Sequence, residues 1–240
     1  WNNWKATLIS QLYSETKLTL EQGGEALNRE NRMAEAKKIL REKLSDWDPK
    51  DIKLETGRHY PPYWQGFQIG AQFAFAKLLK SLGADEIKID LTPDTDRDAT
   101  RICFALSDHP GIFSRLSGAL ALVGANVVDA RSYTSKDGFA TAAFWVQDAD
   151  GAPYDESRFS RLRAMIEKIL SGKIITRDAI KERDKFKKRE RAFKVPTSIT
   201  FNNEGSEIYT IIEVDTRDRP GLLFDLTRTL ANMNVYIASA

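Results

Sequence analysis

Two short stretches of this chain repeat one pattern, and they constrain its fold more than any other feature. The first is Asp108-His109-Pro110-Gly111-Ile112-Phe113 and the second is Asp218-Arg219-Pro220-Gly221-Leu222-Leu223. Each follows an apolar run with strand-like alternation and opens a run with helical spacing. A tight Pro-Gly turn at a helix start leaves backbone N–H groups without partners in the helix, and such ends bind anions. The pattern therefore predicts two small-ligand sites.

An Asn-Val pair follows each turn about one helix later, Asn126-Val127 in the first copy and Asn234-Val235 in the second. Glycine at the fourth position of both turns permits close backbone approach, because it has no Cβ. The alternative is that each turn is only a helix start, with aspartate as a capping or turn residue. Two copies of the whole pattern favour the ligand hypothesis.

Residues 84–203 have the apolar pattern of a complete α+β unit. After an exposed strand at 87–91, the expected order is βαββαβ, a ferredoxin-like arrangement in which two helices cover one face of an antiparallel four-stranded sheet. An Asp-Gly hairpin turn is expected at 136–138. The strands are expected at 102–106, 127–133, 139–147 and 199–201, and the helices at 112–123 and 159–169.

Residues 206–240 repeat only the beginning of that unit. A strand at 209–215, the second turn, a helix with Leu222, Leu223, Leu226 and Leu230, and the start of a strand at Val235 make βαβ. Taken alone, this copy leaves an apolar helix face poorly covered. We therefore expect a second domain of which this sequence contains the N-terminal half.

Residues 1–83 are expected to form a helical region with an interruption at 58–64. Apolar residues at helical spacing occur at 1–12, 33–44 and 71–82. The segment Arg58-His59-Tyr60-Pro61-Pro62-Tyr63-Trp64 is predicted to be a non-helical loop. Its aromatic residues can form a ligand platform or a packed strut, and the strut is the favoured interpretation.

Candidate catalytic and metal-binding residues are few. His59 has no second histidine, cysteine or acidic cluster at ligand spacing. Asp94 and Asp96 have the spacing of a two-carboxylate metal site, but a metal-dependent nucleotidyl transfer site also needs a Gly-Ser phosphate loop and a third carboxylate. An acidic surface turn at 93–98 is therefore favoured. Cys103 is the single cysteine, so no internal disulfide is possible and a reducing compartment is expected.

The overall charge does not require a nucleic-acid or membrane partner. The net charge is +2, from 36 basic and 34 acidic residues, and no apolar run reaches the ~18 residues of a membrane span. A helical insertion is expected at 176–197, and its stretch 181–194 is strongly basic. This stretch can dock an acidic partner or nucleic acid, although a solvated helix is favoured.

The two repeats resemble ACT domains, small regulatory modules that bind amino acids at the strand-to-helix turn. Over its whole length the chain also resembles the C-terminal part of the bifunctional uridylyltransferase/uridylyl-removing enzymes. This wider resemblance rests on the two turns, on 58–64, and on Trp1-Asn2-Asn3-Trp4-Lys5 and Gly205-Ser206-Glu207-Ile208-Tyr209-Thr210.

The resemblance implies a cytoplasmic, multifunctional enzyme of nitrogen metabolism. In that family a Mg²⁺-dependent nucleotidyltransferase domain adds UMP to the PII signalling protein, a His-Asp hydrolase domain removes it, and tandem ACT domains sense glutamine. This chain contains no motif of either catalytic site. The resemblance thus implies a connecting helical region at 1–83, a first ACT domain at 84–203, and part of a second at 206–240, with ACT–ACT pairing within or between chains.

The resemblance also implies roles for individual residues. Backbone N–H groups near Gly111 and Gly221 would hold the glutamine carboxylate. Asp108 and Asp218 would face its ammonium group or stabilise the turns, and Asn126 and Asn234 would bond its polar atoms. No residue of this chain is implied to bind a metal or cofactor. The effector-binding set is Asp108, His109, Pro110, Gly111, Ile112, Phe113, Asn126, Val127, Asp218, Arg219, Pro220, Gly221, Leu222, Leu223 and Asn234.

Two other functions fit the same residues. One is an ACT-domain sensor of a different amino acid, either free-standing or part of another metabolic enzyme. The other is an interaction module in which the basic stretch 181–194 docks PII and the turns bind nothing. Titration with a panel of amino acids distinguishes them.

Overall fold

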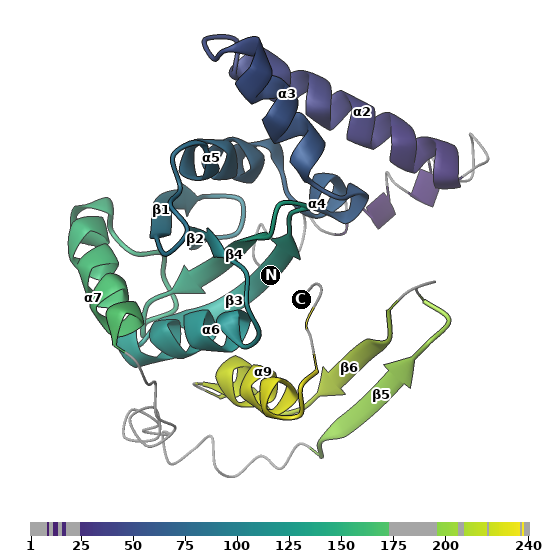
Figure 1. The fold of residues 1–240 in the computed structure, drawn as a ribbon. Helices are drawn as coiled ribbons and strands as arrows, with labels where there is room; N and C mark the ends of the chain where they lie inside the picture. Colours follow the sequence, from purple (N-terminus) through teal and green to yellow (C-terminus); the bar gives the residue numbers. More distant parts are fainter. Residues whose placement is uncertain are drawn as a thin grey trace. The chain divides into compact units, whose positions relative to one another are not determined.

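A computed structural model describes residues 9, 12, 13, 16, 17, 25–172, 196–205, 209–219, 221–235 and 237 (Figure 1). The chain divides into two compact units, one of residues 1–109, 125–164 and 239–240, the other of residues 110–124 and 165–238. Across the described part of the chain, every helix is too short or too polar to cross a membrane. Residues 1–5, the basic stretch 181–194 and most of the expected insertion 176–197 lie outside the described residues.

From residue 25 on, the described part of the first unit has helices α2 (Glu25–Lys43), α3 (Pro49–Arg58), α4 (Pro61–Gly66) and α5 (Ile69–Lys80) ahead of its strands. Leu40 in α2 and Leu44 just after it have no exposed surface, which confirms the expected apolar face. The carboxylate of Asp48 caps α3 by accepting the backbone N–H of Lys50 at 2.8 Å. Pro49 is in the first turn, where a missing N–H breaks no helical hydrogen bond.

The expectation that residues 58–64 cannot be helical was wrong. Helix α3 continues to Arg58, and α4 begins at Pro61. Both prolines lie in the first turn of α4, the one part of a helix where proline is well tolerated. Tyr63 and Trp64 are buried, with their ring centroids 5.2 Å apart in an edge arrangement. The aromatic residues therefore pack in a core, as the strut interpretation predicts.

Four antiparallel strands complete the first unit: β1 (Ile87–Asp94), β2 (Ala99–Ser107), β3 (Asn126–Thr134) and β4 (Phe139–Gln147), in the order β1-β2-β4-β3. Successive side chains point to opposite faces of the sheet. One face contributes Cys103, Ala143 and Trp145 to a core shared with Tyr63 and Phe75. The other face carries the buried Phe104 and Phe144, whose ring centroids are 5.8 Å apart. The α+β, ferredoxin-like fold class is confirmed.

Strand β1 is less exposed and longer than expected. Ile89 and Leu91 are only 5% and 9% exposed, because they pair with Phe104 and Ile102 of β2 and so lie on the same buried face of the sheet. The strand extends through Pro93 to Asp94, so the turn predicted at 93–98 begins only after Asp94.

The strand expected at 199–201 exists, but it does not complete the four-stranded sheet. β5 (Ser198–Asn202) pairs with β6 (Ile211–Asp215) in a separate two-stranded sheet. The place beside β2 is taken by β1, the strand that precedes it. A hairpin neighbour closes a much shorter loop than a strand far along the chain.

Both repeats therefore share the order of a β-hairpin, an Asp-x-Pro-Gly turn and a helix. The limits 84–203 and 206–240 remain predictions, and the pairing of β5 favours its inclusion in the second repeat.

The remaining described helices lie between or after the strands. Helix α6 (Ile112–Val123) ends at Gly124, which has a left-handed backbone with φ 81° and donates to the Ala121 carbonyl at 3.1 Å. This confirms the expected C-terminal glycine. Helix α7 (Phe159–Ser171) follows the 3₁₀ turn η1 (Glu156–Arg158), and α9 (Leu222–Asn232) is the helix of the second repeat.

Candidate functional site

The first Asp-x-Pro-Gly turn has the geometry of a helix N-terminus with a glycine cap. Gly111 has φ 81° and ψ 2°, and its carbonyl accepts the Arg115 N–H at 3.0 Å as the first bond of α6. A left-handed backbone strains any residue with a Cβ, so glycine is required here for its conformation. The N–H groups of the first helical turn have no partner within the helix. The turn therefore presents hydrogen-bond donors and the positive end of the helix dipole.

Asp108 is held in place by the β3–β4 hairpin. Its backbone N–H donates to the Gly138 carbonyl at 2.9 Å, and its carboxylate accepts the Thr134 hydroxyl at 2.7 Å. Thr134 was not predicted as a site residue. Its only sequence signal is a hydroxyl just before the Asp-Gly hairpin turn. A carboxylate has about four acceptor positions, so fixing one of them is compatible with both proposed roles of Asp108.

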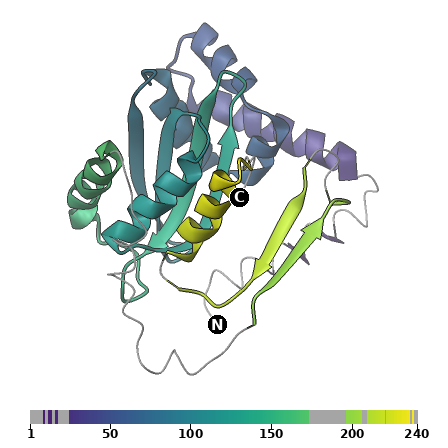
Figure 2. The ribbon, with the colours of Figure 1, turned by 60° about the horizontal axis from the view of Figure 1, so that its bottom comes forward.

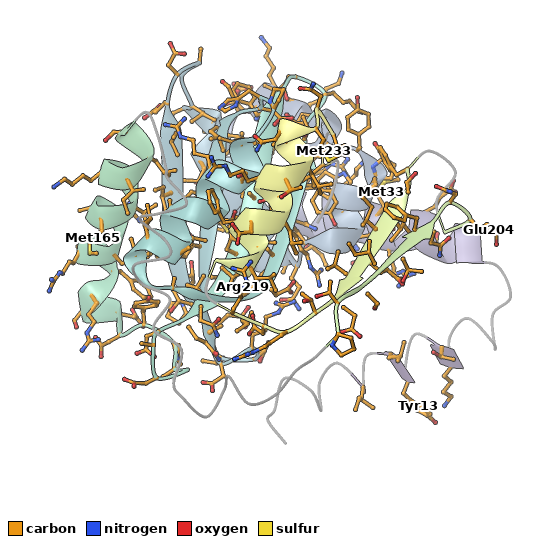
Figure 3. The ribbon with its side chains drawn as sticks, turned by 90° about the horizontal axis from the view of Figure 1, so that it is seen from below. Tyr13, Met33, Met165, Glu204, Arg219 and Met233 are labelled. Carbon is orange, nitrogen blue, oxygen red and sulfur yellow. The ribbon has the colours of Figure 1, made fainter. Side chains whose placement is uncertain are left out.

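The second turn repeats the backbone of the first but differs in its side chains. Gly221 has φ 75° and ψ 6°, and its carbonyl accepts the Asp225 N–H at 3.0 Å. Arg219 takes the place of His109, and its guanidinium pairs with the Asp225 carboxylate at 2.5 Å. Asp218 is exposed, unlike the anchored Asp108, and Pro220 lies outside the described residues. Figure 3 shows Arg219 and Met233 at opposite ends of α9.

The helices of the two repeats pack side by side in opposite directions (Figure 2). Their midpoints meet where the Ser117 hydroxyl lies 3.4 Å from the Thr227 hydroxyl. A Cβ placed on Gly111 would lie 3.8 Å from the Cβ of Ala231, so the start of α6 adjoins the end of α9. The first turn therefore lies beside the C-terminal end of the helix of the other repeat.

Asn126 does not lie near the turn of its own repeat. Ser107, next to Asp108, pairs with Phe139 at one end of β4, whereas Asn126 pairs with Gln147 at the other end. Eight residues of β4 separate these positions, which is roughly 26 Å at about 3.3 Å per residue. One amino acid cannot contact both. The assignment of Asn126 and Val127 to an effector site therefore stays a prediction, and such a site would be separate from that of Asp108.

Asn234 lies at the end of α9 that adjoins the first turn. It lies three residues after Ala231 and has a left-handed backbone with φ 56°. Its N–H donates to the Ala231 carbonyl at 3.1 Å. Its side chain is exposed. The antiparallel helices thus bring together the turn of one repeat and the asparagine of the other.

The apolar members of the predicted set serve mainly as packing residues. Ile112 and Phe113 are 5% and 4% exposed, so they can offer a ligand only backbone groups. Val127, Leu222 and Leu223 are half-buried, while the side chains of His109 and Pro110 are exposed.

The described residues contain no group of three or more histidine, cysteine, aspartate or glutamate side chains able to hold a metal ion. Asp94 accepts the Trp145 indole N–H at 2.6 Å and pairs with Arg97 at 3.3 Å. These contacts support a structural role for Asp94. Burial raises the pKa of the Cys103 thiol to about 12, so it is not a reactive thiolate near neutral pH.

The ACT domain family model matches residues 102–156, a stretch that contains the first turn, α6, β3 and β4. Over its whole length the chain is 65% identical to the bifunctional uridylyltransferase/uridylyl-removing enzyme of Cereibacter sphaeroides and 65% identical to that of Ruegeria pomeroyi. It is 40% identical to the enzyme of Azospirillum brasilense. The alignments cover 26%, 27% and 26% of these relatives, in their C-terminal part. The chain therefore spans about a quarter of the length of its relatives.

Proposed function

We propose a function from the premise that this chain is, over its whole length, a relative of the C-terminal region of the bifunctional uridylyltransferase/uridylyl-removing enzyme family and contains an ACT domain. It is the region through which such an enzyme senses a free amino acid, with glutamine as the effector. The enzyme acts in the cytoplasm, with the PII nitrogen-signalling protein as substrate, and any Mg²⁺ serves its catalytic domains.

The antiparallel contact between α6 and α9 carries this proposal. It places the start of α6, with its left-handed glycine, beside the end of α9, and α9 begins with the same glycine geometry. An α-carboxylate is an anion that helix N-terminal N–H groups bind well. The polar groups at the neighbouring helix end, such as Asn234, can bond the rest of the ligand. The effector therefore bridges two repeats, and its binding depends on how they pair.

Such a bridge supplies the differential binding that allosteric control requires. A ligand that favours one pairing of the repeats shifts the balance between conformations of the whole enzyme. The usual coupling between two sites is about 1–3 kcal/mol. We expect glutamine to favour removal of UMP from PII in the intact enzyme.

Titration calorimetry of the 240-residue chain tests this function. Glutamine should bind and raise the midpoint of thermal unfolding, whereas glutamate should bind more weakly because it carries an additional negative charge. The same titration with a full panel of amino acids tests the rival hypothesis that the chain senses a different amino acid. Absence of heat and of any thermal shift with every amino acid at millimolar concentration would contradict the proposal.

Substitution of the turn glycines locates the site. Gly111→Ala places a Cβ on a left-handed residue, and we expect glutamine affinity to fall roughly tenfold, or about 1.4 kcal/mol. Gly151→Ala is the matched control, because Gly151 has φ 80° and an added Cβ would meet no atom within 4 Å. Both variants bear similar backbone strain. Equal affinities in the two would show that the first turn does not bind the effector.

A further inference from the structure

A pocket of about 530 Å³ lies between α3 and the β3–β4 hairpin, within the first unit. Its lining includes four basic side chains but one carboxylate: Lys50, Lys53, Arg58 and Lys136 against Asp137. Its volume lies within the range of about 300–1,000 Å³ typical of small-molecule sites. None of these residues belongs to the Asp-x-Pro-Gly turns, so this pocket is distinct from the proposed amino-acid site.

The pocket is preformed, because its two walls are joined by direct hydrogen bonds. The Lys136 N–H donates to the Arg58 carbonyl at 2.8 Å, and its ammonium group donates to the Gly57 carbonyl at 2.9 Å. The Arg58 guanidinium, whose side chain is only 8% exposed, pairs with Asp137 at 3.1 Å and with Glu55 at 3.3 Å. The backbone of the two walls is therefore preorganised, while binding still orders the side chains of Lys50 and Lys53.

The pocket carries an excess of positive charge. Arg58 is neutralised by its two carboxylate partners. Lys50 and Lys53 lie three residues apart on α3, hence on the same side of the helix. They are exposed, and their ammonium groups have no ion-pair partner among the described residues. Lys136 uses one of its three donors on Gly57. Three ammonium groups thus remain available to an anion.

The rest of the lining is apolar. Leu54 is 56% exposed and lines the pocket next to Lys53, one helical turn after Lys50. Gly57, one turn further on, leaves the wall open, since an added Cβ would meet no atom within 4 Å. A ligand that fills this pocket therefore has both a multiply charged anionic group and an apolar part.

We propose that this pocket binds a small organic phosphate, such as a nucleotide. Lys50, Lys53 and Lys136 hold the phosphate oxygens, and Leu54 contacts the apolar part. Lysine is a common phosphate ligand that acts as a point charge. A phosphate with about −1.5 to −2 charges matches several ammonium groups better than a single carboxylate does. The pocket is open, but its lining comprises only seven residues, a footprint of small-molecule size.

ATP is the probe for this site, with tripolyphosphate and adenosine as its two halves. In calorimetric titrations of the 240-residue chain, ATP should bind more tightly than tripolyphosphate, and adenosine should not bind detectably. Affinity should fall as salt rises, because the contacts are ionic. Failure of both ATP and tripolyphosphate to bind overturns the proposal. So does tighter binding of a single-stranded oligonucleotide than of ATP.

Variants locate the binding to this pocket. Lys53→Ala should weaken ATP binding about tenfold, the size expected for a lost charge-assisted contact. Lys38→Ala removes the same charge from an exposed position on α2 and should leave affinity unchanged. Leu54→Ser should weaken ATP but not tripolyphosphate. Equal affinities of Lys53→Ala and Lys38→Ala, or no effect of Leu54→Ser on ATP, would overturn the assignment. Glutamine binding should be unaffected in all three variants.

Discussion

His59 is a buried histidine held by its neighbours rather than a ligand for a metal. Its ring stacks on Tyr63 with centroids 3.6 Å apart and planes 4° apart, and its Nε2 lies 3.1 Å from the Glu55 carboxylate. Burial lowers the pKa of His59 more than Glu55 and Asp137 raise it, and the Arg58 charge lowers it further. The folded protein therefore favours the neutral ring.

This pKa predicts a loss of stability in mild acid. The unfolded chain binds the His59 proton near pH 6.5, whereas the folded chain binds it only at lower pH. The stabilisation from neutral His59 is therefore present above about pH 6.5 and is lost as the pH falls below that value. Urea unfolding between pH 7.5 and 5 should show a free energy of unfolding that decreases with pH. The slope should shrink in His59→Asn and remain in His109→Asn, the variant of the other histidine. Equal slopes in all three proteins would exclude this role.

Gly66 is required by a close neighbour and not by its backbone angle. A Cβ at this position would lie 1.9 Å from the Tyr133 hydroxyl oxygen, and the Tyr133 ring packs against Phe67 with centroids 5.1 Å apart. Gly66→Ala should therefore displace the ring and destabilise the fold by about 1–3 kcal/mol. In Gly57→Ala, where an added Cβ meets no atom within 4 Å, helix propensity predicts a gain of about 0.5–1 kcal/mol.

Thermal and urea unfolding of the two alanine variants check this contrast. Gly66→Ala combined with Tyr133→Ala should recover part of the loss, because the clashing ring is absent. A Gly66→Ala protein as stable as the parent would show that Tyr133 moves aside at no cost.

At the scale of elements, the β3–β4 hairpin connects the first turn to α3. One side of the hairpin holds Asp108 through Thr134 and Gly138. The other side holds Arg58 through Asp137 and through the backbone of Lys136. A shift at the turn can therefore reach the connecting helices through one rigid hairpin.

The ion pairs at this hairpin should matter more than those at the surface. Arg58→Ala leaves the Glu55 carboxylate, 2% exposed, without its cationic partner. Loss of one member of a buried pair typically costs about 3–5 kcal/mol. The exposed pair Lys80–Asp51, at 3.4 Å, is a suitable control, and Lys80→Ala should cost less than about 1 kcal/mol. Chemical denaturation of both variants measures the difference, and similar losses would contradict the assigned importance of burial.

At the scale of the whole molecule, the effector site that we propose depends on the pairing of the two repeats. The contact between α6 and α9 is made by small polar side chains at its centre, with Ser117 only 2% and Thr227 only 4% exposed. Such residues allow two helices to approach closely, and a large side chain there forces them apart.

Ser117→Leu should therefore weaken glutamine binding at least about tenfold and lower the free energy of unfolding by about 1–3 kcal/mol. Ser160→Leu makes the same change at an exposed position of α7 and should affect neither quantity. Calorimetry with glutamine and urea unfolding measure the two effects. Undiminished glutamine binding in Ser117→Leu would show that the site does not depend on repeat pairing.

Local chemistry in the sequence determined the elements that depend on near neighbours. The Pro-Gly turns, the C-terminal Gly124 and the Asp-Gly hairpin at 136–138 follow from backbone preferences of a few residues, and all three were predicted correctly. The α4 helix was missed because prolines were assumed to exclude a helix, although they exclude only its interior.

Long-range pairing was decided by the tertiary structure. Sequence periodicity does not distinguish one strand neighbour from another, so the pairing of β5 with β6 instead of with the four-stranded sheet was not predicted. Nor does it show that Asn126 and Asp108 lie at opposite ends of that sheet. The residues of each turn were evident from the sequence, but Ala231, the neighbour of the first turn across the helix contact, comes from the other repeat. Only the antiparallel packing of α6 on α9 brings them together, because that contact depends on side chains more than a hundred residues apart, Ser117 and Thr227.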